Sequence, residues 1–126
     1  MKKVGHITVP PGAIALPHEL VAAAVLAWTG DDVEFLPVRH TKTADIKFRG
    51  REWEIKSPIG KSTRTIENNL RNALKQSSNI IMDLSRIKQP EGKAIKEIKR
   101  QQDLTKGASR VMIITKTKRL IELSVR

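Results

Sequence analysis

Three segments of the chain place apolar residues at the spacing of an α-helix. The segment 19–28 is apolar on nearly all sides, follows Pro17 and stops before Gly30, so it predicts a helix that is largely buried. The segment 62–76 carries one apolar stripe at steps of three and four residues, which predicts an amphipathic helix. The charged segment 93–102 predicts a third helix.

Other segments alternate apolar and polar residues or are short apolar runs, as strands do. The segments 45–49 and 52–56 flank Gly50 and Arg51, and this arrangement predicts a hairpin with these two residues in its turn. Further strands are expected at 33–37, 79–84, 110–115 and 119–124.

The order of the predicted elements is helix, three strands, helix, strand, helix and two strands. Such an order predicts an α/β fold, α+β-like in its opening meander, with a mixed central sheet. At 126 residues the chain has the length of one domain, and we expect residues 1–126 to form it.

The composition excludes several classes of protein. Without cysteine, the chain forms no disulfide scaffold, no thiolate zinc site and no cysteine nucleophile. No apolar run approaches the roughly 18–20 residues that span a bilayer, so we expect no membrane partner. Only 3% of the residues are aromatic, which argues against binding of single strands by stacked bases. We expect the four aromatic residues in the core: Trp28, Phe35, Phe48 and Trp53.

The net charge of +11 is concentrated in one part of the chain. Residues 1–40 hold three basic and four acidic side chains, a net charge of −1. Residues 41–126 hold the other 21 basic and nine acidic side chains, a net charge of +12. A basic surface binds polyanions and gains affinity with each phosphate that it neutralises. We therefore expect nucleic acid as the partner of the second part of the chain.

Within this basic part lies a small acidic group with one lysine. Glu54 and Lys56 are two residues apart on a predicted strand, so their side chains leave the same face. If the predicted turn closes the hairpin, Asp45 pairs with Ser57 or a near neighbour and can approach both side chains.

Two carboxylates and a lysine in this arrangement have a chemical use. Carboxylate oxygens are the ligands that Mg²⁺ and Mn²⁺ prefer, and the bound ion keeps several waters. Such an ion lowers the pKa of a bound water and stabilises charge on a scissile phosphate, while Lys56 orients the water or neutralises the developing charge. The histidines lack the spacing of metal ligands, and we expect them to be structural: His6, His18 and His40.

The spacing of these residues resembles that of the PD-(D/E)XK nuclease superfamily, whose shared core is a helix, a three-strand meander, a helix and a strand. Asp45 is followed after eight residues by Glu54, Ile55 and Lys56, although Ala44 stands where the motif has proline. The resemblance implies a restriction-endonuclease-like αβββαβ core. It also implies Asp45 and Glu54 as catalytic ligands of a divalent metal, Mg²⁺ ahead of Mn²⁺ or Zn²⁺, and Lys56 as the catalytic lysine.

The same resemblance extends to both neighbouring helices. Glu19 matches a glutamate that many members add from the preceding helix, which implies a catalytic residue and a third metal ligand. Gln76 matches a catalytic glutamine that some members carry in the following helix. The amides on its helical line form either a solvated face or a stripe that faces nucleic acid. The expected nucleic-acid contacts are Lys61, Arg64, Asn69, Arg71, Asn72 and Lys75.

A closer resemblance covers the segment 44–84, about a third of the chain. The runs Trp53–Pro58, Asn68–Ser77 and Asn79–Leu84 are similar to those of the C-terminal nuclease toxin domains of contact-dependent growth inhibition proteins and related phage-associated domains. The resemblance implies a toxin that is delivered into a target cell and cleaves tRNA or DNA in its cytoplasm. Of the two substrates we favour tRNA. It also implies a neutralising immunity protein, whose surface we expect to be acidic.

Two other functions use the same residues. A metal-independent, barnase-like ribonuclease would employ His40, Lys56, Ser57 or a threonine as acid–base and phosphate-binding groups. A non-catalytic binder would hold RNA, DNA or an acidic protein through its basic segment, with steep salt dependence and no turnover. Acidic residues embedded in a basic surface favour the metal-dependent endonuclease over both.

Overall fold

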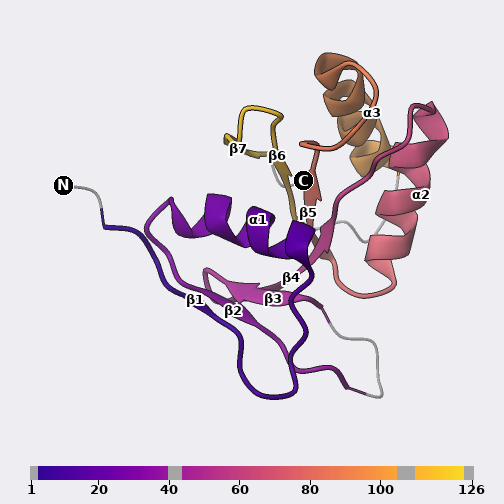
Figure 1. Cartoon of the computed structure of the whole chain (residues 1–126). Coiled ribbons are helices and arrows are strands. Elements are labelled where there is room, and N and C mark those ends of the chain that lie inside the picture. Colours follow the sequence, from indigo (N-terminus) through magenta and orange to yellow (C-terminus); the bar gives the residue numbers. More distant parts are fainter. Residues whose placement is uncertain (1–2, 40–43, 105–109, 124–126) are drawn as a thin grey trace.

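The computed structural model of this chain describes residues 3–39, 44–104 and 110–123. These residues form three helices and one sheet of seven strands (Figure 1). The elements are β1 (Ile7–Thr8), α1 (Pro17–Ala27), β2 (Val33–Phe35), β3 (Ile46–Phe48), β4 (Arg51–Lys56), α2 (Thr63–Leu74), β5 (Asn79–Asp83), α3 (Glu91–Leu104), β6 (Arg110–Ile114) and β7 (Leu120–Glu122).

The sheet combines antiparallel and parallel pairing, and its strands follow one another in chain order. Strands β2, β3 and β4 form an antiparallel meander, and β4, β5 and β6 are parallel. At the two sides, β1 is parallel to β2 and β7 is antiparallel to β6. Parallel neighbours need a crossover, which α2 supplies between β4 and β5, and α3 between β5 and β6. The carboxyl ends of β4, β5 and β6 therefore lie at one edge.

Helices cover both faces of the sheet (Figure 1). Helix α1 packs on one face, where the apolar cluster includes Leu26 and Trp53. Helices α2 and α3 pack on the other face, where the cluster includes Leu70 and Ile80. Because side chains alternate along a strand and Glu54 is paired with Ile80, Glu54 leaves β4 on the face of α2 and α3.

The structure confirms the predicted α/β fold with a mixed sheet, and every predicted helix and strand has a counterpart. Strand β1 was not predicted, because its two residues are too few to show a period. Helix α3 extends beyond the predicted segment 93–102 at both ends. The predicted strand 119–124 corresponds to β7, and its last residue lies outside the described part of the chain.

The predicted turn of the first hairpin was wrong by one residue. Phe48 pairs with Arg51, so the turn consists of Arg49 and Gly50. Both have positive φ, 54° and 74°, which the tight type I′ hairpin turn requires. Arg49 is held in this conformation by ion pairs of 2.9 Å to Asp31 and 3.0 Å to Glu122.

The new turn also changes the expected strand register. Ile46 pairs with Trp53, so the expected pairing of Asp45 with Ser57 was wrong. The backbone N–H of Asp45 donates to the carbonyl of Trp53 over 2.9 Å. The shift places Asp45 beside Glu54.

Helix α1 is less buried than its sequence predicts. Trp28, its C-cap, is 64% exposed, and Val21 is 45% exposed, whereas Leu26 is fully buried. One layer of sheet covers only one side of the helix, so the opposite apolar side faces solvent. The placement of Trp28 in the core was therefore wrong, while Phe35, Phe48 and Trp53 are buried as predicted. Across the described ranges, α1 and the other helices are too short or too polar to cross a membrane.

The packing of α2 on the sheet gives a stability prediction. Leu70 is 1% exposed within the second apolar cluster, so Leu70→Ala removes buried methyl groups and leaves a cavity. We expect the free energy of unfolding, measured with urea, to fall by about 2–5 kcal/mol. The control Leu104→Ala makes the same change at a residue that is 63% exposed. Equal losses in the two variants would contradict the packing described here.

Candidate active site

The hairpin register brings three of the predicted residues together. The carboxylate of Asp45 accepts a hydrogen bond of 2.8 Å from the backbone N–H of Ile55 through Oδ2. Glu54 and Lys56 lie on either side of Ile55 along β4. Asp45 is thereby fixed at the strand that carries the other two residues.

Glu54 and Lys56 form an ion pair at the end of β4. Lys56 Nζ lies 3.6 Å from Glu54 Oε2, and the two side chains are 28% and 8% exposed. The other carboxylate oxygen of Glu54, Oε1, is buried and accepts no hydrogen bond from a donor of the protein. A buried carboxylate oxygen without a donor is costly unless a proton or a cation satisfies it.

Burial and, after it, the negative charge of Asp45 raise the pKa of Glu54 to about 8, against the attraction of Lys56. Burial also raises the pKa of Asp45. There the N–H of Ile55, the Glu54 side chain and Lys56 act in the opposite direction. The interaction between the two side chains lowers the pKa of Asp45 and raises that of Glu54, which favours a charge on Asp45 and a proton on Glu54. Without a cation, the pair therefore holds one proton near neutral pH.

Glu19 lies near this pair, at the beginning of α1. It is 8% exposed, and its Oε1 accepts a hydrogen bond of 3.0 Å from the backbone N–H of Leu16. Burial raises the pKa of Glu19, and the charge of Asp45 raises it as well. The hydrogen bond from Leu16 and the charge of Lys56 act in the opposite direction. The structure thus brings the predicted glutamate of the first helix into the electrostatic environment of the site.

His18 belongs to the same environment, which the sequence did not reveal. Its charge lowers the pKa of both Glu19 and Asp45. His18 was expected to be structural because it lacks the spacing of a metal ligand, but spacing along the sequence does not reveal its position at the start of α1. The available signal was its adjacency to Glu19. His40, the histidine of the alternative ribonuclease hypothesis, lies outside the described residues.

The acidic residues match a divalent cation with few protein ligands. In the described part of the chain, no three histidine or acidic side chains form a group that could hold a metal. Asp45 and Glu54 are nevertheless two adjacent carboxylates, and Glu54 Oε1 lacks a donor. Mg²⁺ commonly uses one or two carboxylates and completes its shell with water and substrate phosphate. The pair fits such an ion, and Glu19 as a third ligand stays a prediction.

Gln76 follows α2 near the beginning of β4, and Asn69 lies within α2. Ser77, the neighbour of Gln76, donates a hydrogen bond of 3.0 Å to the carbonyl of Glu52 in β4. Lys56 lies at the other end of that strand. Asn69 uses its amide locally, donating 2.8 Å to the carbonyl of Thr65. A catalytic role of Gln76 stays a prediction.

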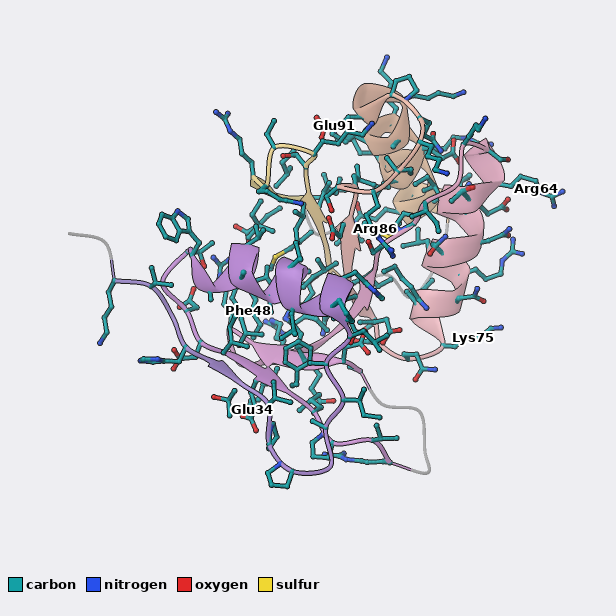
Figure 2. All side chains as sticks on the ribbon, in the orientation of Figure 1. Glu34, Phe48, Arg64, Lys75, Arg86 and Glu91 are labelled. Carbon is teal, nitrogen blue, oxygen red and sulfur yellow. The ribbon has the colours of Figure 1, made fainter. Side chains whose placement is uncertain are left out.

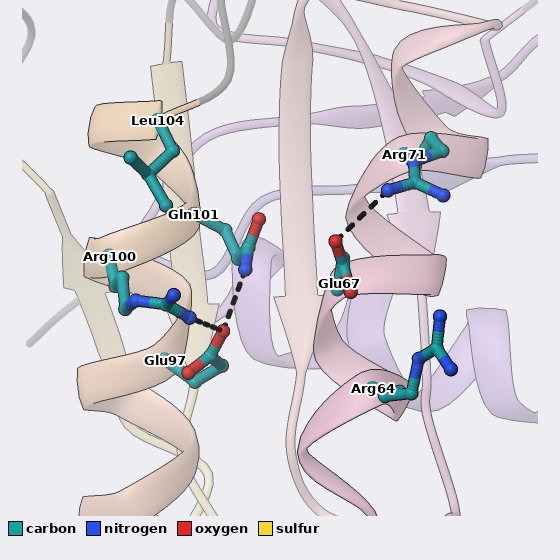
Figure 3. A pocket seen from close by; sticks show the side chains of 7 residues that line it. All are labelled: Arg64, Glu67, Arg71, Glu97, Arg100, Gln101 and Leu104. Carbon is teal, nitrogen blue, oxygen red and sulfur yellow. Dashed lines mark hydrogen bonds and ion pairs between the residues drawn. The ribbon is translucent and has the colours of Figure 1, made fainter.

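The predicted arginines of α2 lie in the lining of a groove to which α3 also contributes (Figure 3). Arg64 and Arg71 line an open groove of about 550 Å³ with Arg100 of α3. Arg71 is paired with Glu67 over 3.0 Å, and Arg100 with Glu97 over 3.1 Å. These are exposed ion pairs within single helices, which contribute little to stability. The other predicted contacts, Lys61, Asn72 and Lys75, are exposed.

The fold and the site define an α/β domain with a buried glutamate, a half-buried aspartate and a lysine at the end of its central strand. A family model for the contact-dependent growth inhibition CdiA C-terminal domain matches residues 42–120. The match covers more than half of the chain, so the chain belongs to this family of C-terminal toxin domains. A comparison with curated proteins gives no match.

A solved structure shares the whole architecture. It is the CdiA-CT/CdiI toxin and immunity complex from Burkholderia pseudomallei, with a TM-score of 0.71 and 22% sequence identity. The match covers 93% of this chain and 98% of the Burkholderia chain. At this level of identity, the likeness shows that the two chains have the same fold.

The raised pKa of Glu54 predicts how stability depends on pH in EDTA. Folding raises this pKa from 4.5 to about 8, so the folded protein binds more protons than the unfolded chain between these values. The contribution of Glu54 to the free energy of unfolding is therefore largest below pH 4.5 and falls as the pH rises to about 8. The slope reaches up to about 1.4 kcal/mol per pH unit.

Urea unfolding of Glu54→Gln at several pH values checks this prediction. We expect the variant to gain stability over the unsubstituted protein as the pH rises through this interval, because glutamine cannot ionise. Glu52→Gln removes a carboxylate from an exposed position of the same strand and isolates the effect of burial. Parallel curves for Glu54→Gln and the unsubstituted protein would show that Glu54 does not retain its proton.

Proposed function

We propose that this domain is a metal-dependent endonuclease of the PD-(D/E)XK type, a toxin that cleaves phosphodiester bonds in nucleic acid, with tRNA favoured over DNA. The observation that carries the proposal is the buried Glu54 with the half-buried Asp45 next to it, both beside Lys56. Burying a carboxyl group next to a second carboxyl group is costly, which supports a functional reason for the position of Glu54.

Asp45 and Glu54 would hold the divalent cation, Mg²⁺ with Mn²⁺ or Zn²⁺ as alternatives. When bound, such a cation supplies Lewis acidity and an acidified water for phosphodiester hydrolysis. Glu54 must lose its proton to act as a ligand, and the positive charge of Lys56 at 3.6 Å favours that loss. Asp45 stays oriented through its hydrogen bond from Ile55.

Lys56 would have a second role once Glu54 holds the cation. Its side chain is 28% exposed, so its ammonium group can reach a substrate phosphate or the attacking water. A positive charge placed there before the reaction stabilises the charge that develops on the phosphate. Glu19 and His18 adjust the charge of the site from the beginning of α1.

The charge and the family support the proposed substrate and partner. The net charge of +12 in residues 41–126 supports a nucleic-acid substrate. The Burkholderia domain is in a complex with its immunity protein CdiI, which supports an immunity protein with an acidic surface as the partner of this chain. In this proposal the domain acts in the cytoplasm of a target cell after delivery.

Cleavage assays with total tRNA and with plasmid DNA test the proposed function. We expect cleavage with Mg²⁺ or Mn²⁺ and none in EDTA. Glu54→Gln and Lys56→Ala should each lower the rate by at least about a hundredfold, because each removes a group that acts on the reacting phosphate.

Glu52→Gln is the matched control and should keep the rate of the unsubstituted protein, since Glu52 is exposed on the same strand. Full cleavage in EDTA, with a 2′,3′-cyclic phosphate product, would instead support the metal-independent ribonuclease. Binding without cleavage under any metal would leave a non-catalytic binder.

A further inference from the structure

The loops at the carboxyl edge of the parallel strands meet around the end of β4. Strand β4 ends at Lys56, and its parallel neighbour β5 ends at Asp83. Ligands of open α/β sheets bind at this edge. The loop that follows β5 is therefore placed beside any substrate of the candidate active site.

Arg86 belongs to this loop and reaches across to the residue that follows Lys56. Its Nε donates a hydrogen bond of 2.9 Å to Ser57 Oγ, and its Nη2 donates one of 2.9 Å to the carbonyl of Ser57. In the view of Figure 2, Arg86 lies between α1 and α2. Two bonds from one planar group fix its orientation and occupy two of its five N–H donors.

Further hydrogen bonds hold this loop against the segments that follow β4 and β6. The backbone N–H of Lys88 donates to the carbonyl of Gly60 over 3.3 Å. Gln89 Nε2 donates to the carbonyl of Ser62 over 3.1 Å, and Lys116 Nζ donates to the carbonyl of Gln89 over 3.0 Å. The guanidinium of Arg86 is thus held by a fixed backbone, so little freedom is left to lose when an anion binds.

Among the described residues, the hydrogen-bond partners of Arg86 are neutral and leave its charge uncompensated. Ser57 offers a neutral hydroxyl and a neutral carbonyl. The ion pairs within the described residues do not include Arg86. An exposed guanidinium with free donors matches an anion, and a phosphate oxygen pair suits its planar fork.

We propose that Arg86 binds a phosphate group of the nucleic-acid backbone beside the Asp45, Glu54 and Lys56 site. The inference rests on the proposed function and adds one substrate contact to it. The negative charge that remains on the carboxyl groups near Lys56 repels a polyanion, and a cation fixed on the opposite loop offsets this repulsion. Arg86 thereby holds the strand next to the bond that is cleaved.

Binding in EDTA tests the contact without cleavage. The probes are total tRNA and linear duplex DNA, titrated by fluorescence anisotropy at several salt concentrations. Arg86→Ala should weaken binding about tenfold and lower the slope of log K against log salt by about one, because one phosphate contact is lost. The control Lys88→Ala removes one charge from an exposed residue of the same loop and should change binding much less.

Two further variants separate phosphate binding from a structural role. Arg86→Lys keeps the charge but not the fork, so binding should fall between that of Arg86→Ala and the unsubstituted protein. Ser57→Ala removes one acceptor and keeps the charge, so it should weaken binding less than Arg86→Ala. Equal losses in Ser57→Ala and Arg86→Ala would overturn the contact and assign Arg86 to loop structure. Equal losses in Arg86→Ala and Lys88→Ala would also overturn it, because any charge on this loop would then have the same effect.

The assay also separates this inference from the proposed function. Unchanged binding by Arg86→Ala, with intact cleavage by the unsubstituted protein, would overturn the role of Arg86 alone. Binding that depends on Arg86, without cleavage under Mg²⁺ or Mn²⁺, would support the contact and contradict the nuclease.

Discussion

The hydrogen bond from the backbone N–H of Ile55 to the carboxylate of Asp45 is the contact on which the site depends. It joins the beginning of the hairpin to β4 at the point where Glu54 and Lys56 leave that strand. A register shift of one residue would turn both side chains to the opposite face and bury them against α1. The tight turn at Arg49 and Gly50 therefore determines the chemistry some distance away, because it sets the register of the whole hairpin.

Strand β4 joins the two halves of the sheet. On one side it closes the antiparallel meander, and on the other it begins the parallel unit with β5 and β6. Its apolar residues Trp53 and Ile55 pack under α1, while Glu54 and Lys56 leave on the other face. The same strand thus supplies apolar side chains whose burial stabilises the fold and a carboxylate whose burial destabilises it. Proteins tolerate such a conflict where function requires it.

The sequence predicted the elements and the chemical group well, because both depend on local patterns. Apolar periodicity located α2 and the strands, and the spacing of Asp45, Glu54 and Lys56 located the acid pair and its lysine. The turn was misplaced, because in a sequence only glycine marks a position that tolerates positive φ. Arg49 also adopts a positive φ, with support from its ion pairs to Asp31 and Glu122.

Features that depend on tertiary packing could not be predicted in the same way. The exposed side of α1 reflects a sheet that covers one face only, although the helix is apolar on nearly all sides. The approach of His18 to Asp45 joins segments that are distant in sequence. The contact of Arg86 with Ser57 joins two loops 29 residues apart, and no motif marks it. Each of these arises from topology rather than from neighbouring residues.

The two tryptophans give this domain a built-in optical probe. The chain has no tyrosine, so its near-ultraviolet emission comes from Trp28 and Trp53 alone. Trp28 is 64% exposed, whereas Trp53 is 1% exposed and its Nε1 donates a hydrogen bond of 2.9 Å to the carbonyl of Phe48. A water-soluble quencher therefore reaches only the indole of Trp28. The residual, blue-shifted emission of Trp53 then follows the hairpin directly next to Glu54, without any label.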